Sequence, residues 1–136
     1  MRPITGMTDA LLAIDDLGDE LEAVLRWAIE FKRLWKSGDE VVLNFMPLDT
    51  LTVGCIYEKP STRTRVSFEV GIDRLGGNPL TLLKNDIQLG TSETVSDTAK
   101  VLSRFLGAIT YRCYAHADVI ELAESADVPV INALSD

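Results

Sequence analysis

Residues 51–77 read LTVGCIYEKPSTRTRVSFEVGIDRLGG, which is an apolar run, a short polar loop and a segment with helical periodicity. The apolar run at 51–56 predicts a buried strand. Apolar side chains then recur at spacings of three and four from Phe68 to Leu75, which predicts a helix that ends at the glycine pair 76–77. A strand that leads through a tight loop into a helix is the unit from which the rest of the fold is inferred.

The loop between this strand and this helix is rich in hydroxyl and guanidinium groups. Its five residues are Ser61, Thr62, Arg63, Thr64 and Arg65. The first backbone N–H groups of a helix have no intrahelical partner and lie at the positive end of its dipole, so they favour an anion. The alternative is a Ser or Thr that only caps the helix, with solvated arginines beside it. Because two arginines near the cap oppose the dipole unless an anion compensates them, we expect an anion site here.

Strand-like and helix-like segments alternate along the rest of the chain. Predicted strands lie at 79–83, 108–112 and 128–132, and predicted helices at 15–37, 94–106 and 117–126. Residues 39–50 are expected to form a connector, and residues 87–93 an exposed loop. Strands that alternate with helices of this length indicate a parallel sheet with helices on both faces. We therefore expect one α/β, Rossmann-like three-layer domain over residues 1–136.

The composition of this chain disfavours some classes of binding partner. Its 136 residues are 46% hydrophobic and have a formal net charge of −8. An acidic chain disfavours nucleic acid or an anionic membrane as a partner, although local arginines can still bind a small anion. No run approaches the roughly 20 apolar residues of a membrane span, and the N-terminus lacks the apolar core of a signal peptide. We expect a cytoplasmic protein.

The sequence offers little for metal or cofactor chemistry. Cys55 and Cys113 lie in apolar runs and are expected to be buried, reduced thiols. The one histidine, His116, is interpreted as a residue that opens a helix. Neither G-x-G-x-x-G nor G-x-x-x-x-G-K-[ST] occurs. We therefore expect no metal and no cofactor, and a site that binds and polarises a phosphate-bearing molecule through donors and cations.

Two further residues are expected at the edge of the sheet where ligands bind, beyond the carboxyl ends of the strands. Arg112 ends the predicted strand at 108–112, and Gln88 lies in the loop that follows the predicted strand at 79–83. Both are candidates to join the loop at 61–65. The alternatives are a strand-terminal surface arginine and a solvated glutamine.

The segment from Tyr57 to Glu69 resembles the signature of the aspartate/ornithine carbamoyltransferases, aromatic-x-[Glu/Lys]-x-Ser-[Thr/Gly]-Arg-Thr. Tyr57 stands where that family usually has Phe. Residues 11–17 are similar to the family's opening helix region, and segments at 86–90, 93–104 and 128–136 are similar to its ornithine branch. The assignment to that branch depends mainly on Gln88 and on the lack of a lysine just before Glu93.

The resemblance implies roles for the candidate residues. Ser61, Thr62, Arg63 and Thr64 would bind carbamoyl phosphate, with Arg63 and the helix N-terminus on the phosphate. Thr64 and Arg112 would contact the carbamoyl oxygen, so Arg63, Thr64 and Arg112 are the implied catalytic residues. Gln88 would reach the phosphate bound to an adjacent subunit of a homotrimer, or of a multiple of it. The implied reaction forms citrulline and phosphate from carbamoyl phosphate and ornithine, in arginine metabolism.

The family continues beyond the position of Asp136 with a His-Pro-x-Gln segment and a second domain that binds ornithine. By this resemblance the chain is the carbamoyl-phosphate-binding part alone, and we expect the 136 residues by themselves to be inactive. Two alternatives stay open. One is the same domain of a transferase with another amine acceptor, such as aspartate. The other is a non-catalytic module for anion binding or oligomerisation.

Overall fold

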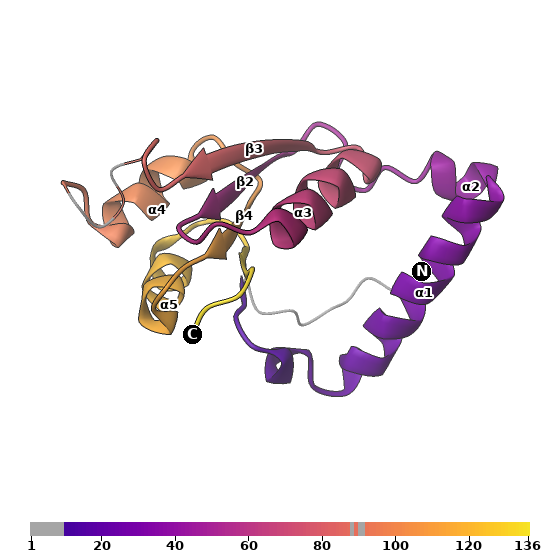
Figure 1. Ribbon diagram of the computed structural model, residues 1–136, viewed down its shortest axis with the longest axis horizontal. Coiled ribbons are helices and arrows are strands. Elements are labelled where there is room, and N and C mark those ends of the chain that lie inside the picture. Colours follow the sequence, from indigo (N-terminus) through magenta and orange to yellow (C-terminus); the bar gives the residue numbers. More distant parts are fainter. Residues whose placement is uncertain (1–9, 88, 90–91) are drawn as a thin grey trace.

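The computed structural model describes residues 10–87, 89 and 92–136 (Figure 1). Within these residues the sheet has five strands, all parallel, in the order β1-β5-β4-β2-β3. The strands are β1 Ala10–Leu11, β2 Thr52–Tyr57, β3 Asn78–Leu83, β4 Ala108–Arg112 and β5 Val130–Asn132. The helices are η1 Ile14–Glu20, α1 Leu21–Ser37, α2 Glu40–Leu43, α3 Thr62–Arg74, α4 Val95–Ser103 and α5 His116–Ser125. The predicted parallel α/β architecture is confirmed.

Two buried clusters lie on opposite faces of the sheet and give it three layers. Side chains of β2 alternate, so that Val53, Cys55 and Tyr57 pack with Ile72 of α3. Ile56 belongs to the other cluster, which includes side chains of β4, α4 and α5. Figure 1 shows α3 on one side of the sheet and α4 and α5 on the other. The expected covering of both faces is therefore confirmed.

The N-terminal region differs from the prediction in two ways. The single helix expected at 15–37 is wrong, because Gly18 adopts φ 47° and ψ −126° and separates the 3₁₀ helix η1 from α1. Residues 11–17 are not helical throughout either, since Ala10 and Leu11 form strand β1 and pair with β5. A strand of two residues is too short for an alternating pattern, so periodicity gave no signal for it.

The connector predicted at 39–50 contains the short helix α2. Asp39 caps it, because its carboxylate accepts hydrogen bonds from the N–H groups of Val41 and Val42 at 3.1 and 3.2 Å. Helix α1 lies apart from the sheet (Figure 1) and has no fully buried residue. It contacts the end of α3 through the ring of Trp35, which is 4.9 Å from the guanidinium carbon of Arg74.

No helix among the described residues is both long enough and apolar enough to cross a membrane.

Removing the Tyr57 hydroxyl is expected to cost little stability. Tyr57 is 4% exposed, and its buried hydroxyl has no hydrogen-bond partner among the residues that the structure describes. A buried hydroxyl without a partner costs free energy, so Tyr57→Phe should leave the free energy of unfolding unchanged or raise it by up to about 1 kcal/mol. Urea denaturation measures the change, and Tyr114→Phe, on a half-exposed ring, is the control. A clear loss of stability in Tyr57→Phe would contradict the expectation.

Candidate functional site

The N-terminus of α3 is open to an anion. Ser61 precedes the helix in an extended conformation, and its hydroxyl accepts a hydrogen bond from the N–H of Thr64 at 3.3 Å. Ser61 therefore caps the helix, as the alternative to an anion site expects. The first turn of α3 contains no acidic residue that could neutralise the helix dipole. The cap and the exposed end of the dipole coexist, so capping does not exclude an anion site.

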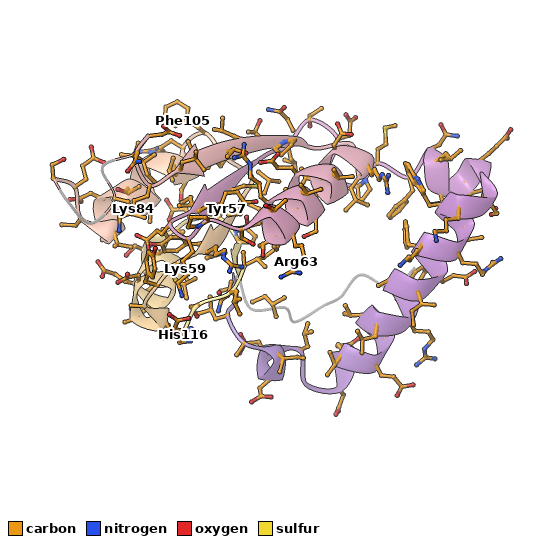
Figure 2. The ribbon with its side chains drawn as sticks, in the orientation of Figure 1. Tyr57, Lys59, Arg63, Lys84, Phe105 and His116 are labelled. Atoms are coloured by element: carbon orange, nitrogen blue, oxygen red, sulfur yellow. The ribbon has the colours of Figure 1, made fainter. Side chains whose placement is uncertain are left out.

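The two arginines of the loop differ in their surroundings. Arg65 pairs with Glu69, with Nε 2.8 Å from the carboxylate, as expected for positions i and i+4 on a helix. Arg63 is exposed and forms no ion pair with the residues that the structure describes. Figure 2 shows its side chain extending away from α3 at the start of the helix. Arg63 is thus the arginine of this loop whose charge is uncompensated.

The structure brings Arg112 to the same place. Arg112 is the last residue of β4 and lies opposite Tyr57 in the parallel register of β2 and β4. Its Nη1 donates a hydrogen bond to the hydroxyl of Thr64 at 2.7 Å, although 48 residues separate the two in sequence. Its Nε is buried and has no hydrogen-bond partner within the described part of the chain. Arg112 is therefore part-buried and aimed at the helix end, unlike a strand-terminal surface arginine.

Two hollows adjoin the loop at 61–65. One, of about 680 Å³, is lined by Arg63, Thr64, Asn132 and Leu134 among others. The other, of about 640 Å³, is lined by Lys59, Ser61, Thr62 and Lys84 among others. The loop therefore presents side chains to open space on two sides.

Two lysines around this loop were not predicted as part of the site. The ammonium groups of Lys59 and Lys84 lie 4.9 and 5.4 Å from the centre of the Tyr114 ring. Lys59 also pairs with Asp136 at 2.5 Å. Lys59 stands only two residues before Ser61, and that proximity in sequence was the available signal. The sequence gives no such signal for Lys84, because only the pairing of β3 with β2 brings Lys84 near the loop at 61–65.

Gln88, His116 and the two cysteines add less information about the site. Gln88 lies outside the described residues, so its predicted role remains a prediction. His116 opens α5, as interpreted, and its Nδ1 is 2.7 Å from the hydroxyl of Ser135. Cys55 and Cys113 are buried free thiols, and burial raises the pKa of both. In the described part of the chain, no three His, Cys, Asp or Glu side chains gather as metal ligands would.

Comparison with known proteins gives one consistent family. The model of the "Aspartate/ornithine carbamoyltransferase, carbamoyl-P binding domain" matches residues 10–136. The catabolic ornithine carbamoyltransferase of Thermoplasma volcanium is 47% identical over 126 residues, which are 93% of this chain and 39% of that protein. The ornithine carbamoyltransferase of Methanopyrus kandleri is 48% identical over 130 residues, which are 95% of this chain and 41% of that protein.

Solved structures agree. The ornithine carbamoyltransferase of Pyrococcus furiosus superposes with a TM-score of 0.86 at 47% identity, covering 93% of this chain and 40% of that one. The enzyme of Burkholderia thailandensis superposes with a TM-score of 0.85 at 37% identity, covering 95% and 43%. The chain thus spans well under half the length of the relatives it matches. Because both sequence and fold match over nearly all of its own length, the chain belongs to the aspartate/ornithine carbamoyltransferase family, as a carbamoyl-phosphate-binding domain.

Proposed function

We propose that this chain supplies the carbamoyl phosphate site of an ornithine carbamoyltransferase, which makes citrulline and phosphate from carbamoyl phosphate and ornithine. The observation on which this depends is the meeting of Arg112 and Thr64 at 2.7 Å beside the N-terminus of α3. It joins a helix end suited to phosphate with a guanidinium group suited to a carbonyl oxygen. The relatives named for ornithine favour ornithine over aspartate as the acceptor.

The phosphate is assigned to the start of α3. Ser61, Thr62 and Arg63 provide hydroxyl groups and a charge that has no ion pair among the described residues. They lie next to the N–H groups of Thr62 and Arg63, which have no partner within the helix. Charge-assisted hydrogen bonds from such donors are shorter and stronger than neutral ones. Because phosphate is also the leaving group, the same contacts stabilise the charge that it gains when its bond to the carbamoyl carbon breaks.

The carbamoyl group is assigned to Thr64 and Arg112. Attack by an amine on the carbamoyl carbon places negative charge on the carbonyl oxygen, and fixed donors stabilise that charge. The Thr64 hydroxyl already accepts a hydrogen bond from Arg112, so its own proton is free for a ligand oxygen. The buried Nε of Arg112, which has no partner in residues 10–87, 89 and 92–136, adds a second donor to the pair.

Further parts of the proposal concern the parent enzyme. Gln88 would reach the phosphate bound to an adjacent subunit of a homotrimer or a multiple of it, and ornithine would bind a second domain. We also propose that residues 1–136 form a single domain of that enzyme. We place the enzyme in the cytoplasm and in arginine biosynthesis. The relative described as catabolic is compatible with the same binding chemistry, since one site serves both directions of a reaction.

Loss of Arg63 is expected to weaken binding of carbamoyl phosphate. Hydrogen bonds to charged groups contribute about 1.5–3 kcal/mol, so Arg63→Ala should raise the dissociation constant about tenfold or more. Isothermal titration of this chain with carbamoyl phosphate measures the change. Arg33→Ala removes an exposed arginine that pairs with Glu30 on α1, and it should leave binding unaltered. Equal binding by Arg63→Ala and the unsubstituted chain would refute the phosphate assignment.

Loss of the Thr64 hydroxyl is expected to act on the carbamoyl group. Thr64→Val keeps the shape of the side chain but removes the hydroxyl, whereas Thr64→Ser keeps the hydroxyl. We expect Thr64→Val to lose about tenfold in affinity for carbamoyl phosphate and much less for inorganic phosphate, and Thr64→Ser to bind both nearly normally. Competition titrations with the two ligands measure this. An equal loss for both ligands would show that Thr64 binds the phosphate instead.

A further inference from the structure

Glu58 is a largely buried carboxylate that neither the capping pattern nor the anion site explains. It follows β2 directly, and its side chain is only 10% exposed. It points to the face of the sheet opposite α3, because it continues the alternation of Ile56. Burial, and next the charge of Glu58, raise the pKa of the Tyr111 hydroxyl and the Cys113 thiol, which lie on this face. A carboxylate in such a place requires partners.

The partners of Glu58 lie at the ends of two neighbouring strands. Its N–H donates to the carbonyl oxygen of Arg112 at 2.9 Å, and its carboxylate accepts from the N–H of Tyr114 at 3.1 Å. The ammonium group of Lys84, just beyond β3, is 3.9 Å from the same carboxylate. One residue therefore connects the end of β2, which leads into the loop at 61–65, to the segment that includes Arg112.

We propose that Glu58 is a positioning residue of the carbamoyl phosphate site, which holds Arg112 against Thr64 by binding the backbone on both sides of Cys113. This inference rests on the proposed function. Glu58 and Arg112 point to opposite faces of the sheet, so Glu58 acts through the backbone and does not touch the ligand. The backbone N–H of Glu58 closes a ring that runs through the loop to Thr64, across to the Arg112 side chain, and back through the Arg112 carbonyl. The carboxylate of Glu58 fixes this ring on its other side, at the N–H of Tyr114.

The ring matters because the hydrogen-bond donors of a guanidinium group are fixed in one plane, so Arg112 must be held in the correct position to reach its partner. Arg112 reaches Thr64 from a strand end whose next residues, Cys113 and Tyr114, leave the sheet. Without the carboxylate the N–H of Tyr114 loses the acceptor that fixes the backbone just after Arg112. Displacements on the order of 1 Å far from the chemistry are enough to reduce activity about a hundredfold. Losing this support should therefore weaken the carbamoyl contact while the helix N-terminus still binds phosphate.

The test compares variants of Glu58 in this chain by titration with carbamoyl phosphate and with inorganic phosphate. Glu58→Met keeps the length of the side chain but has no acceptor, and Glu58→Gln keeps an acceptor oxygen. Glu58→Asp is one methylene shorter, so it keeps the charge but should not reach the N–H of Tyr114. It replaces Glu58→Met in the test if Glu58→Met does not fold. Asp39→Ala is the matched control, since it removes a carboxylate that also accepts backbone N–H groups, but at α2 and far from the site.

We expect Glu58→Met and Glu58→Asp to bind carbamoyl phosphate about tenfold more weakly, with largely unchanged affinity for inorganic phosphate. Glu58→Gln and Asp39→Ala should bind both ligands as the unsubstituted chain does. In a double-mutant cycle, Glu58→Met should add nothing to the loss caused by Arg112→Met, because both remove the same contact.

Three results would overturn the positioning role. They are unaltered carbamoyl phosphate binding by Glu58→Met, an equal loss for both ligands, and losses that add in the double mutant. Each leaves the proposed function intact as long as the unsubstituted chain binds carbamoyl phosphate. If the unsubstituted chain binds neither ligand, the proposed function itself is wrong and the positioning role falls with it.

Discussion

The parallel pairing of β2 with β4 is the constraint on which the rest of the site depends. Its register sets Tyr57 opposite Arg112, so the loop after β2 and the last residue of β4 emerge at the same edge of the sheet. Burial of Cys55 and Ile56 on opposite faces fixes that register, since a slip of one residue would exchange the two faces. The hydrogen bond between Arg112 and Thr64 follows from the pairing.

The sequence was sufficient to predict elements with strong local patterns. Strand β4 was predicted with its observed bounds, and α3 was predicted from its apolar spacing and glycine stop. Strand β1 was missed because it is two residues long and exists only by pairing with β5. The role of Glu58 was equally invisible, because a glutamate beside a lysine in a polar loop has no pattern that distinguishes burial from exposure.

The proposed site reconciles an acidic chain with an anionic ligand. The formal net charge is −8, yet several cationic side chains lie close together near α3, and only some of them form ion pairs with carboxylates. Arg65 and Lys59 are compensated by Glu69 and Asp136, and Arg63 is left uncompensated at the positive end of the helix dipole. Charge at short range therefore decides what binds, since solvent ions screen the acidic surface over about 10 Å.

The most direct test of the central claim is an NMR titration of this chain with carbamoyl phosphate that follows each backbone amide. We expect the largest shifts on the N–H groups of Thr62, Arg63 and Thr64, with a second group at Arg112 and the residues that follow it. Shifts confined to other parts of the chain, with these amides unmoved at saturation, would contradict the claim.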